Sequence, residues 1–139
     1  MSTLTHQLPL SRNAGLWPFY VGAVADVAVG LALSLFAADI AHLLMPDQVT
    51  ILGFATASVM RFLGVFLLLF ALETVVVAWS QGAMATFRSW VVAANWATVA
   101  AAIVVLALWH SAFSAIGIVA VAVVGVAVGT FAALQRRAL

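Results

Sequence analysis

Four long apolar segments dominate the chain, at about residues 16–38, 51–79, 89–110 and 114–134. Each is close to or longer than the roughly 20 residues that an α-helix needs to cross a bilayer. Their hydrophobic residues run continuously instead of alternating with polar ones, which excludes a membrane-spanning β-barrel. The pattern therefore predicts four transmembrane helices.

The breaks between these segments have the chemistry of turns. Residues 45–48 contain Pro46, which disfavours a helical conformation in the residue before it, and residues 81–86 are a polar, glycine-containing link. The link at 110–114 is so short that the third and fourth helices must be antiparallel neighbours. We expect an all-α, antiparallel four-helix transmembrane bundle over residues 16–139, preceded by a cytoplasmic or interfacial tail at residues 1–15.

Composition agrees with a chain whose main partner is the lipid bilayer. Of the 139 residues, 67% are hydrophobic and 6% are charged, whereas a soluble domain is about 45–50% apolar and about 25% charged. The net charge of +1 gives no attraction for nucleic acid. The absence of cysteine removes disulfides, thiolate catalysis and cysteine-ligated metal centres. With no phosphate loop, dinucleotide fingerprint or nucleophile–base pair, the sequence favours a non-enzymatic protein.

Arginine predicts the orientation of the bundle. With four spans, the two termini and the link at 81–86 lie on one side of the membrane, and the other two links lie on the opposite side. The first side carries only basic residues and the second only acidic ones, so the positive-inside rule places both termini in the cytoplasm. The basic residues are Arg12, Arg88, Arg136 and Arg137, and the acidic ones are Asp39 and Asp47.

Two opposite charges fall deep within the predicted spans. Asp26 lies ~15 Å into the first helix and Arg61 lies ~16 Å from the opposite membrane face in the second, so we expect them at similar depths. Charges in a membrane normally face the bundle and have a partner. The sequence thus predicts an Asp26–Arg61 ion pair, which either fixes helix register or serves a proton relay, an ion relay or a ligand headgroup.

Other polar residues suggest weaker sites. Glu73 lies ~9 Å from the inner end of the second helix and Asn95 lies at a similar depth in the third, which predicts an interhelical hydrogen bond or a proton-accepting carboxylate. Asp39, His42 and His110 gather at the outer face, where they could ligate a metal, or the two histidines a haem. Otherwise the sequence predicts no cofactor.

Glycines mark the surfaces where helices can approach closely. Gly22 and Gly30 flank Asp26 at spacings of four residues, and Gly64 follows Arg61. Gly125 and Gly129 form a GxxxG pattern in the fourth helix, predicting a close contact either inside the bundle or between protomers.

The last 80 residues or so resemble small uncharacterised four-span bacterial inner-membrane proteins. The similarity rests on Arg61 and Gly64 in the second helix, Asn95 and Trp96 in the third, and the basic end of the fourth at residues 131–137. That group has no assigned activity, so the resemblance implies a four-span architecture and no site residue. The small multidrug transporters are a looser comparison, in which Asp26 would correspond to their carboxylate in helix one.

Three functions remain open on the sequence alone. The first is a small homo-oligomer or an accessory subunit of a larger membrane complex. The second is a small transporter or channel for a proton, a cation or a small apolar molecule, with Asp26, Arg61 and Glu73 as its gating or coupling charges. The third is a binder of lipid, quinone or pigment. Contact between Asp26 and Arg61 would favour a structural role, and their separation around a cavity would favour transport or ligand binding.

Overall fold

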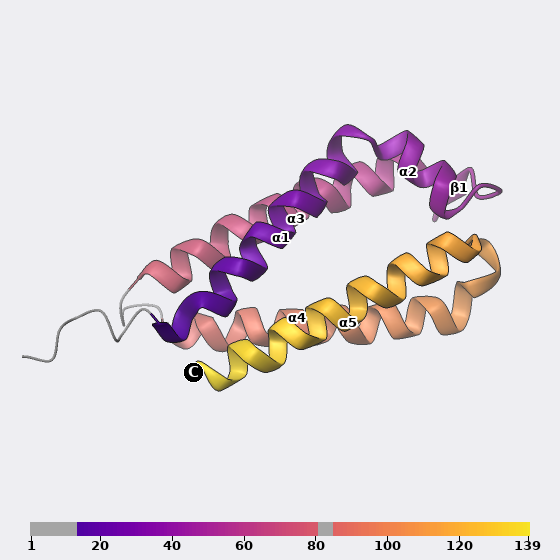
Figure 1. Ribbon diagram of the computed structural model, residues 1–139. Helices are drawn as coiled ribbons and strands as arrows, with labels where there is room; N and C mark the ends of the chain where they lie inside the picture. The colour runs from indigo at the N-terminus through magenta and orange to yellow at the C-terminus, as the bar shows by residue number, and fades with distance from the viewer. Residues whose placement is uncertain (1–13, 81–84) are drawn as a thin grey trace, which may run out of the picture.

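The computed structural model describes residues 14–80 and 85–139, so Arg12 and nearly all of the predicted tail at 1–15 lie outside the described residues. The described chain is almost entirely helical (Figure 1). Its elements in order are η2 (Ala14–Leu16), α1 (Trp17–Leu35), α2 (Ala37–Leu44), β1 (Thr50–Ile51), β2 (Phe54–Ala55), α3 (Thr56–Trp79), α4 (Ala85–Trp109), η3 (His110–Ala112) and α5 (Ala115–Arg137).

Four of these helices, α1, α3, α4 and α5, are long and apolar enough to cross a membrane. The predicted all-α four-helix bundle is therefore confirmed, and the chain is an integral membrane protein. The start of α1 and the end of α5 lie at the same end of the bundle, which we call the terminal end (Figure 1). The opposite end, with α2, the two strands and η3, is called the loop end.

The loop end departs from the predicted helix boundaries. The first helix ends at Leu35, because Phe36 has φ −111° and ψ 30°, and a separate short helix, α2, follows. Residues 50–55 form an antiparallel β-hairpin, so α3 begins at Thr56 and not near residue 51. The turn of this hairpin has two residues with positive φ, Leu52 and Gly53, as a type I′ turn requires.

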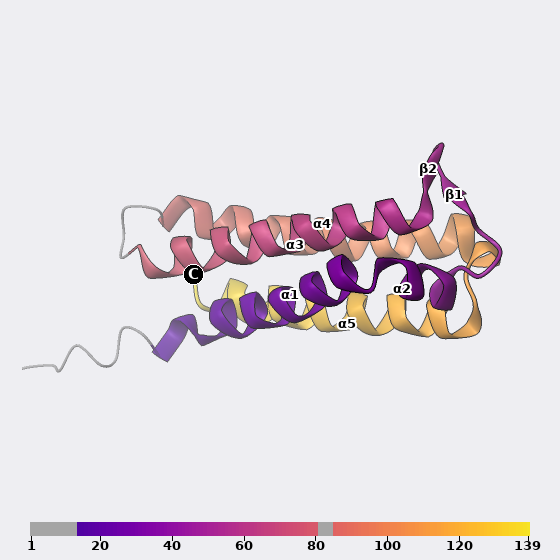
Figure 2. The same cartoon turned by 90° about the horizontal axis from the view of Figure 1, so that it is seen from above.

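The four spans form two pairs arranged as a square. Helix α1 packs mainly against α3, and α4 packs mainly against α5, while contacts between the pairs are much less extensive. Figures 1 and 2, viewed at right angles, place α1 diagonally opposite α4, and α3 diagonally opposite α5. Each helix of one pair therefore has one neighbour in the other pair.

The α1/α3 pair is closer than the α4/α5 pair. A Cβ atom on Gly30 would lie 2.9 Å from the carbonyl oxygen of Gly64, and a Cβ on Gly64 would lie 2.7 Å from that of Gly30. In contrast, Cβ atoms on Gly125 and Gly129 would make ordinary contacts with α4, at 3.6 and 3.5 Å. Both glycine sets thus lie inside the bundle, and only the α1/α3 crossing has no space for a side chain.

The pairs are joined at the two ends of the bundle. At the terminal end a hydrophobic cluster combines residues from η2, α1, α3 and α4, namely Leu16, Phe19, Val77, Ala78, Val91 and Val92. At the loop end a second cluster is built around Ala37, Ala41, Met45 and Met60, with Phe113 packed against it. The polar residues of interest lie between or beside these clusters.

Candidate functional site

Asp26 is positioned at the centre of the bundle by the two glycines on either side of it. Gly22 faces α5, because a Cβ there would lie 3.2 Å from the Gln135 side chain, and Gly30 faces α3. Successive positions four apart rotate by ~40° around a helix, so the two glycines point ~80° apart. In the square arrangement the directions from one helix to its two neighbours form a right angle, which is close to this value. Asp26, halfway between them and half-buried, therefore points toward the middle of the square.

Arg61 does not pair with this carboxylate. Its Nε donates a hydrogen bond of 3.4 Å to the backbone carbonyl of Ser34, eight residues and ~12 Å along α1 from Asp26. The Arg61 side chain is exposed and lies at the C-terminal turn of α1, where a cation is favourable to the helix dipole. The structure thus does not bring Asp26 and Arg61 together, and the expected ion pair is replaced by a contact with the end of α1.

Asn95 is hydrogen-bonded inside the bundle, but not to Glu73. Its Nδ2 donates to Gln135 Oε1 at 2.7 Å, and Gln135 Nε2 donates to the carbonyl of Pro18 at 3.4 Å. These two bonds link α4, α5 and α1, so Gln135 bridges two diagonally opposed helices across the interior. Gln135 is only 1% exposed. Together with Asn95 it lies at the level of Pro18–Gly22, and we call the polar residues at this level the polar layer.

Glu73 lies on the opposite face of α3 from this layer. It is nine residues after Gly64, which places it ~180° around the helix from the glycine that contacts α1. Its side chain is exposed. The predicted Glu73–Asn95 contact is therefore not formed, because Asn95 faces the interior and Glu73 faces away from α1.

Thr74, next to Glu73, turns inward instead. It belongs to the buried positions of α3 with Ala71 and Ala78, is 1% exposed, and its hydroxyl has no hydrogen-bond partner within the described residues. The antiparallel pairing of Gly30 with Gly64 places Thr74 near the level of Tyr20, in the polar layer. Each of the four spans thus contributes a polar residue to the interior of the bundle: Asp26, Thr74, Asn95 and Gln135.

The polar residues of the loop end do not assemble into a metal site. Asp39 and His42 are exposed on α2, and His110 is exposed in η3. Within residues 14–80 and 85–139 no group of three or more His, Cys, Asp or Glu residues is arranged to hold a metal ion. The combination of Asp39, His42 and His110 as three ligands of one metal is therefore not formed.

Ser114 instead fixes the loop end. Its hydroxyl donates to the carbonyl of Leu43 at 2.7 Å and accepts from the N–H of Gly117 at 3.0 Å, capping α5. Its N–H donates to the carbonyl of Leu44 at 2.8 Å, and Gly117 allows that carbonyl a close approach. This set of contacts joins the end of α2 to the start of α5.

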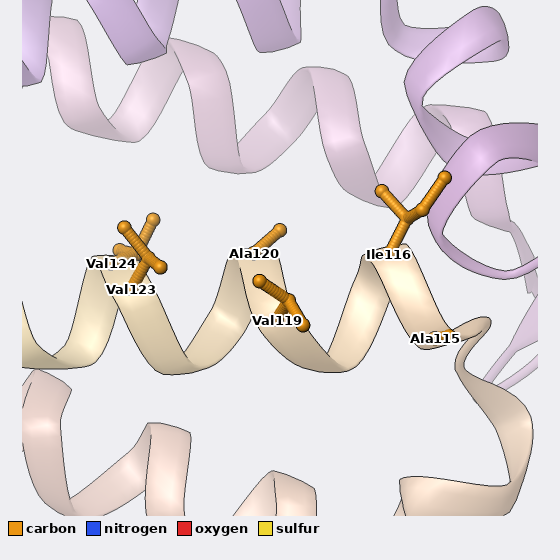
Figure 3. A pocket seen from close by; sticks show the side chains of 6 residues that line it. All are labelled: Ala115, Ile116, Val119, Ala120, Val123 and Val124. Atoms are coloured by element: carbon orange, nitrogen blue, oxygen red, sulfur yellow. The ribbon is translucent and has the colours of Figure 1, made fainter.

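A groove of about 580 Å³ runs along α5 and has a purely apolar lining. Figure 3 shows Ile116 and Ala120 turned toward the side of the bundle where α1–α3 lie. The residues that line the groove are Ala115, Ile116, Val119, Ala120, Val123 and Val124. No polar side chain lines it, so it is separate from the inward polar residues. Comparison with protein-family models, with curated proteins and with solved structures finds no match to this chain.

Proposed function

We propose that this protein is a small membrane transporter in which Asp26 binds a proton or a small cation. The observation that carries the proposal is the position of Asp26 at the centre of the four spans without Arg61 beside it. A charge near the middle of a bilayer costs on the order of 2.5–3.5 kcal/mol on insertion scales, and such residues commonly mark ion or proton pathways. A proton or a cation on Asp26 offsets that cost.

The neighbouring polar residues support the proposal because they supply neutral ligands. The Thr74 hydroxyl has no hydrogen-bond partner among the described residues, and Asn95 and Gln135 hold amide groups in the same layer. A cation that leaves water needs such oxygens in place of its hydration shell. The layer lies between Asp26 and the terminal end, on the path from the carboxylate to that membrane face.

The division into two helix pairs supports movement of the bound ion. Close glycine contacts hold α1 to α3, while the two pairs have less extensive contacts with each other. Transport proteins commonly expose a central site to each side by rocking one rigid helix group against another. Here the hydrogen bonds of Gln135 and Ser114 join the two pairs at opposite ends of the bundle, so opening at either end would break one of these contacts.

Flux into liposomes tests the proposal. Purified wild type, Asp26→Asn and Glu73→Gln are reconstituted, and entry of protons, Na⁺ and K⁺ is followed with entrapped fluorescent indicators. Glu73→Gln is the matched control because it removes a carboxylate that faces away from α1. We expect Asp26→Asn to reduce flux by at least about tenfold and Glu73→Gln to leave it near the wild-type value. Equal flux in wild type and Asp26→Asn, or no flux above empty liposomes for any of the three ions, would contradict transport through Asp26.

A second candidate function is that of a subunit in a homo-oligomer or a larger membrane complex, without enzymatic activity. Glu73 favours it, because an exposed carboxylate ~9 Å from the end of α3 is costly when it faces lipid and a partner helix would cover it. Native mass spectrometry of wild type and Glu73→Gln distinguishes the outcomes. A monomeric wild type would contradict this role.

The orientation in the membrane is also proposed. Arg88, Arg136 and Arg137 all lie at the terminal end, and the positive-inside rule assigns such an end to the cytoplasm. A reporter fused after Leu139 should be active on the cytoplasmic side of an inner membrane, and activity on the other side would reverse the assignment.

A further inference from the structure

The β-hairpin at the loop end carries apolar side chains that contact almost nothing within the described chain. Leu52 and Phe54 in the hairpin are 89% and 68% exposed, and Val49, directly before it, is 79% exposed. Leu52 occupies the turn with a φ of 53°, a left-handed conformation that is unfavourable for a bulky residue. Hairpin turns of this type ordinarily use Asn, Asp or Gly at such a position. A leucine here is neither favoured by the backbone nor buried by the fold.

The direction of the hairpin is fixed by hydrogen bonds at its base. The buried Thr56 donates its hydroxyl proton to the carbonyl of Gln48 at 2.5 Å and its N–H to the carbonyl of Val49 at 3.0 Å. The Gln48 side chain in turn donates to the carbonyl of Thr50. Figure 2 shows the strands standing away from the end of α3, across the direction of the helix axes. Because the spans run along the bilayer normal, an element that projects sideways from their ends lies along the membrane surface.

We propose that the tip of this hairpin inserts Leu52 and Phe54 into the boundary between headgroups and acyl chains of the leaflet at the loop end. The tip has no charged residue between Asp47 and Arg61, which suits an apolar environment. Its two short strands leave backbone groups unpaired at their outer edges, and these require water or headgroups, so the hairpin stays at the interface and does not enter the hydrocarbon core. Trp109, 53% exposed at the end of α4, marks the same boundary, as aromatic residues do at membrane surfaces.

The occupant of this surface is lipid and not a second protein, since the hairpin lies beside spans that are themselves surrounded by lipid. The absence of native cysteine allows a direct test. Leu52→Cys and, separately, Phe54→Cys are labelled with a nitroxide in the full-length protein and reconstituted in phosphatidylcholine–phosphatidylglycerol vesicles. Collision rates with oxygen, which concentrates in the bilayer, and with a nickel chelate, which stays in water, give the depth of each label. Asp47→Cys, exposed at the same end outside the hairpin, is the matched control.

We expect the oxygen-to-nickel accessibility ratio to be several-fold higher at positions 52 and 54 than at position 47. Using two labelled positions keeps the test valid if the substitution in the turn prevents folding. Equal ratios at all three positions would show that the tip is in water and would overturn the proposal. Labels at 52 and 54 that are shielded from both reagents would show a protein partner on the tip, which would overturn it as well.

Discussion

The α1/α3 crossing should tolerate no side chain at Gly64. A Cβ atom there would lie 2.5 Å from Ser34 Oγ and 2.7 Å from both Ser34 N and Gly30 O. Two of these three atoms are backbone, so the helices themselves must separate. Restoring a contact of about 3.5 Å requires a displacement of roughly 0.8 Å, and a gap of that size forfeits about a quarter to a half of each dispersion contact along the interface. We expect Gly64→Ala to cost about 1–3 kcal/mol of the free energy of unfolding.

Gly125→Ala is the matched control, because its Cβ would lie 3.6 Å from Ala102 Cβ, an ordinary contact. Its expected change is within about 0.5 kcal/mol. Both variants are compared with wild type by reversible unfolding in mixed micelles, with native tryptophan fluorescence as the signal. A Gly64→Ala protein as stable as wild type, or a Gly125→Ala protein equally destabilised, would refute the assignment of the tight crossing to α1/α3.

Two further substitutions test the joints between the helix pairs. Gln135→Leu should lower the free energy of unfolding by about 1–3 kcal/mol, because it leaves Asn95 without its partner inside the bundle. The double variant with Asn95→Leu should recover part of this loss. An unchanged free energy of unfolding in Gln135→Leu would argue against the bridge. Ser114→Ala removes the α5 cap and the bond to Leu43, so we expect a loss of about 0.5–2 kcal/mol and faster amide exchange at the start of α5. Unchanged exchange there would show that Ser114 does not fix the loop end.

The number and type of the spans could be predicted because the bilayer sets their length. A continuous apolar run of about 20 residues has few alternatives to a helix in lipid, since every backbone group must be hydrogen-bonded internally. The break at Phe36 and the hairpin at 50–55 could not be predicted from hydropathy. Their residues are as apolar as the helices on either side, and the structure is decided there by backbone conformation and packing.

The hairpin also explains why Arg61 lies less deep than the sequence predicts. If the second helix began near residue 51, Arg61 would lie ~16 Å into it. Because α3 begins at Thr56, Arg61 is five residues in, ~8 Å from the helix start, and reaches Ser34 near the end of α1. The glycine stripe predicts the inward position of Asp26, but the predicted ion pair with Arg61 is not formed.

Gln135 was missed because its sequence context is typical of a membrane rim. It directly precedes Arg136 and Arg137 in the last turn of α5, where a polar residue ordinarily faces headgroups. The sequence does not reveal how α5 is rotated about its axis. This rotation directs Gln135 toward α1 and α4, while the two arginines remain exposed. Thr74 was missed for a related reason, since a threonine in a transmembrane helix usually bonds its own backbone.

A double-mutant cycle of Asp26→Asn and Arg61→Gln measures most directly whether Asp26 is independent of Arg61. The free energy of unfolding and the liposome flux are recorded for all four proteins. We predict that the two stability changes add within about 0.5 kcal/mol, and that flux is lost with Asp26→Asn and remains lost in the double variant. A coupling of more than about 1 kcal/mol, or flux restored when both charges are removed, would instead show that Asp26 and Arg61 form the buried ion pair that the structure lacks.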